Sequence, residues 1–177
     1  MVAALAEAGA LPFSIAPSSA LVAASGVPAA FLDEPLLLAL ERGLLPVLYG
    51  DVVLDRERGV SICSTESLFA LLAERLPERG VTVKRAIWLG ETAGVYDRDG
   101  RTLPRLSRRD LHAAGASIGG SRGTDVTGGM RHRVETALAL ADLGVPSLIA
   151  DGQVPGLLAS ALAGEEVPGT VVVSRAS

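Results

Sequence analysis

Short hydrophobic runs alternate with segments of helical periodicity along most of the chain. Apolar runs bounded by Gly or Pro indicate buried strands, whereas apolar residues three and four positions apart indicate amphipathic helices. Strands are therefore expected at 11–16, 46–49, 52–54, 60–63, 85–89, 146–150 and 170–174. Helices are expected at 34–42, 65–76, 128–143 and 154–163. This alternation predicts an α/β fold with a mainly parallel sheet and helices on both of its faces.

Turn and capping residues separate these elements. The segment Asp55–Gly59 joins two of the short strands and predicts a hairpin, and Asp97–Gly100 predicts a turn. Ser107 and Asp110 have the spacing of a capping box, which predicts a brief helix after them. Gly and Ser are frequent at 116–123, so this segment is expected to be a mobile surface loop.

Composition and charge narrow the class of protein. The chain is 49% hydrophobic and 20% charged, as in a globular domain. Aromatic residues make up only 3%, the formal net charge is −4, and no basic stripe is present, so nucleic acid is not an expected partner. Pro, Gly or charged residues interrupt every long apolar stretch, so no membrane span is expected. The single cysteine, Cys63, excludes an internal disulfide, fits a cytoplasmic setting and is expected to be a buried apolar residue.

The first candidate for chemistry is the glycine-bearing segment that opens the helix expected at 128–143. Adjacent glycines let the backbone approach a ligand, and the free N–H groups and dipole of a helix start favour anions. Arg133, one turn further along, could reach a phosphate oxygen. An ordinary helix start capped by Asp125 and Thr127 remains the alternative. The candidate phosphate-binding residues are Asp125, Thr127, Gly128, Gly129, Met130 and Arg133.

A second candidate directly follows the strand expected at 85–89. Ligands of open α/β sheets bind outside the carboxyl ends of strands. Gly90 and Gly94 permit a tight turn there, and Tyr96 offers a flat face and a hydroxyl. Spacing alone equally describes a plain strand-to-turn connection.

Two acidic residues are further candidates. Asp51 follows Tyr49-Gly50 at a strand end, where it could hold a magnesium-bound water, although a turn-forming role is the simpler interpretation. Glu66 lies in the first turn of a helix that Ser64 is expected to cap, a position where an acid usually balances the helix dipole.

Six segments, taken in order, resemble the isopentenyl phosphate kinase family of the amino acid kinase superfamily. They are Pro46–Val53, the hairpin, Ser64–Glu66, Gly94–Asp97, Asp125–Met130 and Gly169–Thr170. The runs Pro-Val-Leu-Tyr-Gly-Asp and Asp-Val-Thr-Gly-Gly-Met are the most specific. The resemblance implies an αβα sandwich that uses ATP and Mg²⁺ to convert isopentenyl phosphate, a small phosphate acceptor, to isopentenyl diphosphate.

The resemblance also implies roles for individual residues. The loops Gly94–Asp97 and Asp125–Met130 are expected to line the ATP site, together with Gly90 and Glu91. Arg133 stands where the family usually has a Lys that contacts ATP phosphates. Glu66 stands where the family has an Asp that organises catalytic lysines, and Ala93 replaces a second Asp. The implied catalytic residues are Asp51, Glu66 and Arg133, with no metal ligated by protein side chains alone.

The family pattern opens with a strand, a Lys and a Gly-Gly loop, followed by a His that binds the acceptor phosphate, and these features are not found before Glu34. Residues 1–45 are therefore expected to be a remnant of the phosphoacceptor lobe of an N-terminally truncated chain, and 46–177 the ATP-binding lobe. Activity of this chain alone is expected to be poor. The alternatives are a catalytically impaired nucleotide-binding module, or a kinase with another acceptor such as fosfomycin or an amino acid. A homo-oligomer is a further expectation from the family.

Overall fold

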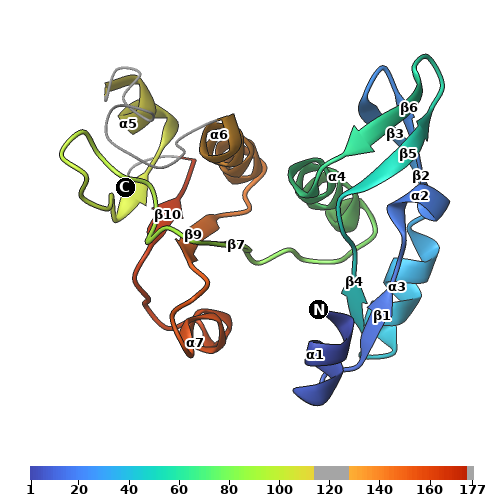
Figure 1. Ribbon diagram of the computed structural model, residues 1–177, viewed down its shortest axis with the longest axis horizontal. Coiled ribbons are helices and arrows are strands. Elements are labelled where there is room, and N and C mark those ends of the chain that lie inside the picture. Colours follow the sequence, from blue (N-terminus) through green and yellow to red (C-terminus); the bar gives the residue numbers. More distant parts are fainter. Residues whose placement is uncertain (114–127, 175–177) are drawn as a thin grey trace. The chain divides into compact units, whose positions relative to one another are not determined.

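The computed structural model describes residues 1–113 and 128–174, which belong to two compact units, Met1–Leu71 and Leu72–Ser177 (Figure 1). Helix α4 (Thr65–Glu78) begins in the first unit and ends in the second. Four of the seven strand ladders among the described residues are parallel, which confirms the predicted mixed α/β class. Within the described residues, no helix is long and apolar enough to cross a membrane. The predicted functional boundary at residues 45/46 stays a prediction.

The first unit contains two small sheets. Its helices before α4 are α1 (Val2–Glu7), α2 (Pro17–Ala20) and α3 (Glu34–Glu41). Its strands are β1 (Pro12–Ser14), β2 (Leu21–Ala24), β3 (Val27–Phe31), β4 (Leu45–Val47), β5 (Asp51–Asp55) and β6 (Gly59–Cys63). Strands β1 and β4 pair in parallel, and the other four form a sheet in the order β3-β2-β5-β6.

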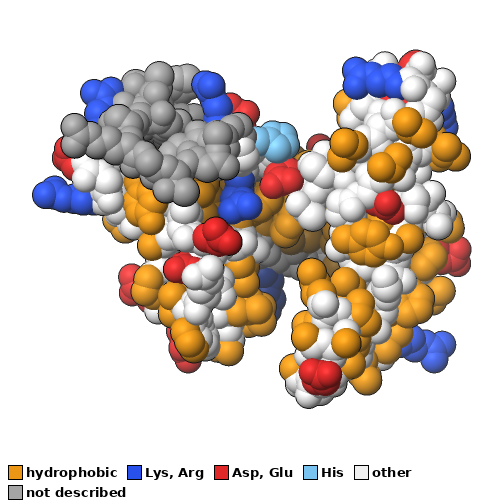
Figure 2. Space-filling model, in the orientation of Figure 1, with side chains coloured by type: hydrophobic (Ala, Val, Ile, Leu, Met, Phe, Trp, Pro, Cys, Tyr) orange, Lys and Arg blue, Asp and Glu red, His pale blue; other side chains and the backbone are white. Residues whose placement is uncertain are grey.

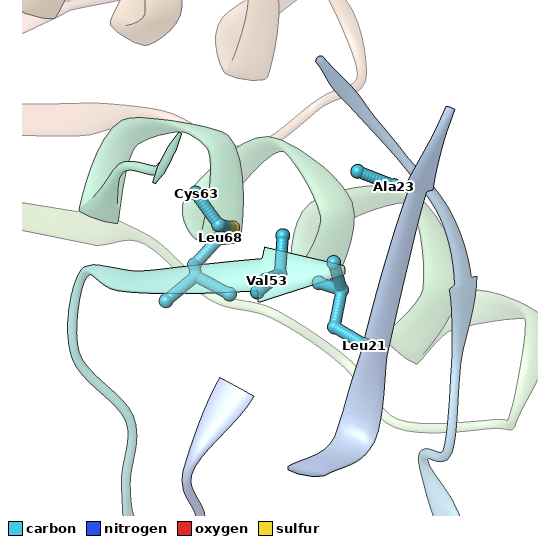
Figure 3. Packing of buried hydrophobic residues seen from close by; sticks show 5 residues of the cluster. All are labelled: Leu21, Ala23, Val53, Cys63 and Leu68. Carbon is cyan, nitrogen blue, oxygen red and sulfur yellow. The ribbon is translucent and has the colours of Figure 1, made fainter. Parts of the chain in front are cut away.

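One face of the four-stranded sheet forms the core of the first unit. Leu21, Ala23, Val53 and Cys63 pack there with Leu68 of α4 (Figure 3). Side chains alternate between the faces of a strand, so period-two patterning places these residues together. Cys63 is buried as predicted, and burial raises the pKa of its thiol, with a smaller contribution from the negative charge of Asp51.

The opposite face of the β5–β6 hairpin carries exposed apolar side chains. Val52 lies opposite Ile62 and Leu54 lies opposite Val60 across the hairpin, and all four are exposed. Hydrophobic side chains accordingly interrupt the polar surface in this region (Figure 2). An exposed apolar face of this kind is typical of an interaction surface, and the expected homo-oligomer stays a prediction.

The Asp55 carboxylate joins the two turns of this sheet by hydrogen bonds. Asp55, at the end of β5, is only 5% exposed. Its two oxygens accept hydrogen bonds from the backbone N–H groups of four residues and from the hydroxyl of Ser61 at 2.6 Å. The four N–H donors come from the β2–β3 turn and the β5–β6 turn, at Ser25, Gly26, Glu57 and Arg58.

The second unit is a three-layer αβα arrangement. Its strands are β7 (Ala86–Gly90), β8 (Arg105–Leu106), β9 (Ser147–Asp151) and β10 (Thr170–Val172), and its helices are α5 (Arg108–Ala113), α6 (Gly128–Asp142) and α7 (Leu157–Ala163). The sheet order is β7-β9-β10-β8. Helices α6 and α7 lie on opposite faces of this sheet (Figure 1). Leu157 and Ala161 of α7 pack on Leu148 and Ala150 of β9.

Most predicted elements are confirmed, with small shifts at their ends. The helix predicted at 154–163 begins only at Leu157, because Gly156 adopts φ +78°, which is not helical. The strand predicted at 46–49 is β4, in which only Val47 is buried. The capping box is confirmed, since the backbone N–H of Ser107 donates to Asp110 at 2.9 Å. The loop predicted at 116–123 lies outside the described residues.

Candidate functional site

The carboxyl ends of β7 and β9 meet at one edge of the second sheet. The two strands pair in parallel with Gly90 opposite Asp151. The backbone N–H of Gly152 donates to the carbonyl of Gly90 at 2.8 Å, which extends the pairing past the strand ends. Glu91 follows directly and is exposed. This edge is where open α/β sheets bind ligands.

Arg133 of α6 reaches this edge. A methyl group placed on Gly90 would lie 2.9 Å from Nη1 of Arg133, so the guanidinium sits against the backbone at the end of β7. Nε of Arg133 is buried and has no hydrogen-bond partner among the described residues. A buried donor without a partner costs about 1–3 kcal/mol, so this cation is suited to an external acceptor.

The Gly94–Asp97 loop lies between β7 and β8. Tyr96 is 40% exposed, and its hydroxyl accepts the N–H of Ala93 at 3.2 Å. Asp97 accepts the N–H groups of Asp99 and Arg101, each at 2.9 Å. The Asp97 carboxylate therefore shapes the predicted turn, and the exposed ring of Tyr96 remains available to a ligand.

The start of α6 is the remaining part of the predicted phosphate site. Gly128 begins the helix, Gly129 is exposed with no described atom within 4 Å of the position that a Cβ would take, and Met130 is half-buried. The first N–H groups of a helix have no partner within it and favour an anion. Asp125 and Thr127, the other predicted residues of this segment, lie outside the described residues.

Asp51 and Glu66 belong to the first unit. The N–H of Ser18 in α2 donates to Oδ2 of Asp51 at 3.0 Å. Hydrogen bonding from the side chain and backbone of Ser18 lowers the pKa of Asp51. Glu66 accepts the hydroxyl of Thr65 at 3.1 Å at the start of α4. Asp51 thus already has a structural partner, and the catalytic roles of both acids stay predictions.

Two polar residues near the edge of the second sheet were not predicted as site residues, although one of them, Thr170, belongs to a segment that resembles the family. Asp151 is half-buried at the end of β9 and accepts the N–H of Gln153 at 2.9 Å. Because Asp151 directly follows the buried run 147–150, its place at the carboxyl end of a strand could have been predicted from the sequence. Thr170, the other residue, begins β10 and is fully buried, and no periodic pattern distinguishes it from a core position.

The donor set of this site suits phosphate better than a metal ion bound by protein alone. In the described parts of the chain, no three His, Cys, Asp or Glu residues are grouped so that they could hold a metal ion. The edge instead offers the Arg133 guanidinium, two glycines that admit close backbone approach, and a helix start. These groups bind the oxygens of an anion.

Comparisons with known proteins show to which family the chain is similar. The model of the Amino acid kinase family matches residues 1–151. The isopentenyl phosphate kinase of Methanothermobacter thermautotrophicus is 40% identical over 145 residues, which are 77% of this chain and 51% of that protein. The glutamate 5-kinase of Geobacter metallireducens is 33% identical over 149 residues, or 78% of this chain and 37% of that protein.

A solved structure of isopentenyl phosphate kinase shares the fold. It aligns with a TM-score of 0.79 at 31% identity, covering 97% of this chain and 63% of that one. The chain spans about half the length of the curated isopentenyl phosphate kinase that it matches.

Proposed function

The chain belongs to the amino acid kinase family, and we propose that its second unit binds Mg-ATP in a kinase that converts isopentenyl phosphate to isopentenyl diphosphate. The observation that carries the nucleotide site is the buried, unpartnered Nε of Arg133 beside Gly90. The 40% identity to the isopentenyl phosphate kinase of Methanothermobacter thermautotrophicus supports isopentenyl phosphate as the acceptor.

Arg133 is placed to bind a phosphate group. Charged hydrogen bonds from a guanidinium to phosphate are short and can be bidentate. A phosphate oxygen at the carboxyl edge of β7 and β9 would accept from the guanidinium, and a shift of this side chain would let the oxygen reach Nε, which is buried and has no acceptor among the described residues. Gly90 contributes by lacking a Cβ, since a side chain there would press on Nη1 of Arg133 at 2.9 Å.

The other predicted residues would complete the nucleotide site. The α6 start at Gly128 and Gly129 would donate backbone N–H groups to phosphate oxygens, and the role of Thr127 stays a prediction. Tyr96 would offer its ring to the nucleotide. Phosphoryl transfer depends mainly on positioning and charge neutralisation, which these groups supply on the nucleotide side.

Magnesium would enter with the nucleotide phosphates. When bound, Mg²⁺ neutralises charge between phosphate oxygens, and carboxylates hold it directly or through water. Glu91 and Asp151 are the carboxylates of this sheet edge, and the role predicted for Asp51 stays a prediction. With fewer than three such ligands grouped in the described residues, most of its coordination would come from phosphate and water.

A second candidate acceptor is an amino acid. The similarity to glutamate 5-kinase, at 33% identity, favours this alternative over other acceptors. Isopentenyl phosphate remains the better-supported acceptor because the identity to its kinase is higher. Release of ADP that depends on isopentenyl phosphate, compared with release that depends on glutamate, separates the two.

Calorimetric titration with Mg-ATP tests the nucleotide site. We expect Arg133→Ala to weaken ATP binding by about 1.5–3 kcal/mol, the value of a charged hydrogen bond, which is roughly a 10- to 150-fold loss of affinity. Arg131→Ala is the matched control. Arg131 lies on the same helix, is 73% exposed and already pairs with Glu135 at 3.3 Å. Exposed pairs of this kind contribute little.

Two results would contradict the proposal. One is the absence of binding heat and of a thermal shift when the folded chain meets millimolar ATP. The other is an equal loss of ATP affinity in Arg133→Ala and Arg131→Ala. Arg133 would then contribute only to the overall positive charge and not to a specific phosphate contact.

A further inference from the structure

Thr170 connects the Gly94–Asp97 loop to the sheet of the second unit. We propose that Thr170 is a positioning residue, which holds this loop in the shape that binds nucleotide without itself touching the ligand. The proposal rests on the proposed nucleotide site and adds a residue to it. Thr170 is fully buried, so it can act only through the residues that it contacts.

The Thr170 hydroxyl uses both of its hydrogen-bonding functions. Oγ1 accepts the backbone N–H of Val95 at 2.8 Å and donates to the carbonyl of Leu103 at 2.6 Å. Val95 and Leu103 are themselves joined, because the N–H of Leu103 donates to the carbonyl of Val95 at 2.8 Å. One hydroxyl therefore fixes both sides of the turn that carries Tyr96.

Gly94 makes this close approach possible. A Cβ on Gly94 would lie 2.6 Å from Oγ1 of Thr170 and 2.8 Å from Cγ2 of Thr102. Its φ of +147° is also in the range that favours glycine. Gly94 is thus required for packing against Thr170, in addition to any contact with a ligand.

Gly169 plays the corresponding part on the strand side. A Cβ there would lie 2.7 Å from the carbonyl oxygen of Ile149, so the missing side chain lets β10 begin tightly against β9. Thr170 is consequently anchored in the sheet, where it pairs with Ile149. Each residue of the Gly169-Thr170 dipeptide thus has a role: Gly169 lets β10 approach β9 closely, and the Thr170 hydroxyl bonds to the loop.

The side-chain hydrogen bonds of Tyr96 and Asp97 are local to the loop. Tyr96 forms an isolated bridge with Thr102 and accepts the N–H of Ala93, and Asp97 accepts from its own turn. These contacts shape the loop locally, whereas Thr170 joins it to the sheet. Removal of the hydroxyl would leave the Val95 N–H and the Leu103 carbonyl buried without this partner.

Three variants test the role. Thr170→Val keeps the shape and removes the hydroxyl, whereas Thr170→Ser keeps the hydroxyl. Thr136→Val is the matched control, because Thr136 is also buried and its hydroxyl donates to the carbonyl of His132 within α6, at 2.9 Å. The measurements are hydrogen exchange of the Val95 amide without nucleotide, ATP affinity, and the KM values for ATP and for the acceptor.

We expect Thr170→Val to accelerate Val95 exchange, to weaken ATP binding about tenfold, and to raise the KM for ATP while leaving the acceptor KM unchanged. Thr170→Ser should restore ATP affinity, and Thr136→Val should retain it. If Thr170→Val does not fold, Thr170→Cys, whose thiol is a weak donor, provides the same comparison.

Faster Val95 exchange with undiminished ATP affinity would overturn the positioning role and leave the nucleotide site intact. Failure of Thr170→Ser to recover affinity would overturn it as well. Absence of ATP binding by the unsubstituted chain would instead refute the proposed function, while the exchange measurement still reports on the contact itself.

Discussion

Asp55 of the first unit and Arg133 of the second are both charged side chains held against the backbone of a sheet, yet their surroundings differ. Asp55 accepts five hydrogen bonds from two turns and from Ser61. Arg133 has a buried Nε without a partner among the described residues. The first charge is saturated by its own fold, and the second is not.

The difference predicts that the charge of Asp55 is structural and that the charge of Arg133 serves a ligand. A carboxylate that accepts several N–H groups lowers the free energy of the folded state and has little capacity left for a ligand. A buried donor without an acceptor raises the free energy of the folded state. Its presence therefore calls for another explanation, such as a role in binding or catalysis. Substitution of Asp55 should therefore affect stability, and substitution of Arg133 should affect binding.

The largest expected effect on stability comes from Asp55→Ala. It removes the acceptor for four backbone N–H groups and a hydroxyl, so we expect a clear fall in the thermal midpoint of the first unit, without a direct effect on nucleotide affinity. Glu57→Ala is the control, since Glu57 also accepts the N–H of Ser25, at 2.7 Å, but is exposed. An equally small effect of both substitutions would break the comparison.

The same hydrogen bonds predict the direction of a pH effect. Hydrogen bonding from the Ser61 hydroxyl is the main cause that lowers the pKa of Asp55 from its ordinary value of 3.8. The folded state thus binds this proton less readily than the unfolded chain. The stability that Asp55 contributes is present above about pH 4 and is lost as the pH falls below that value. Acid unfolding followed by circular dichroism should show a smaller pH dependence in Asp55→Asn.

Local signals in the sequence predicted much of the fold. The β5–β6 hairpin, the capping box at Ser107 and the αβα alternation of the second unit each depend on residues close together in the chain. The region before Glu34 was predicted poorly. Its strands β2 and β3 are short and pair with each other across the Ser25-Gly26 turn, a local signal that the prediction missed, whereas the pairing of β2 with β5 joins residues far apart in the sequence.

The site was predictable only in part for the same reason. Glycines and an arginine near a helix start are visible in the sequence, and the structure places Arg133 beside Gly90. The contacts of Asp55 with Ser25 and Gly26 and the contact of Thr170 with Val95 were not predicted, because they join residues about 30 and 75 positions apart. No local spacing encodes such contacts, and propensity is insensitive to them.

A smaller effect is expected from Ser107→Ala. The Ser107 hydroxyl donates to Asp110 at 2.6 Å, and the Ser107 N–H donates to the same oxygen at 2.9 Å. Loss of a helix N-cap costs about 0.5–2 kcal/mol, which denaturant unfolding would detect. Ser107 is saturated like Asp55, so ATP affinity should be retained by the folded variant. If Ser107→Ala lost ATP affinity without losing stability, the distinction between side chains with all hydrogen-bond partners, such as Ser107 and Asp55, and those without, such as Arg133, would be contradicted.

The smallest effect is expected from Gly90→Ala. Its Cβ would lie 2.9 Å from Nη1 of Arg133, with no other atom of the described residues within 4 Å outside its immediate neighbours. The end of a flexible side chain can move, so stability should hardly change. The displaced guanidinium should bind phosphate less well, by about 0.5–1.5 kcal/mol, the value of one ordinary hydrogen bond.

A double-mutant cycle decides whether Gly90 acts through Arg133. In the Arg133→Ala background the guanidinium is absent, so the added methyl group has nothing to displace, and Gly90→Ala should no longer alter ATP affinity. The coupling energy from the cycle then equals the loss that Gly90→Ala causes alone. If that loss persists without Arg133, the methyl group instead blocks the ligand directly, and the importance of Gly90 lies in backbone approach to the nucleotide.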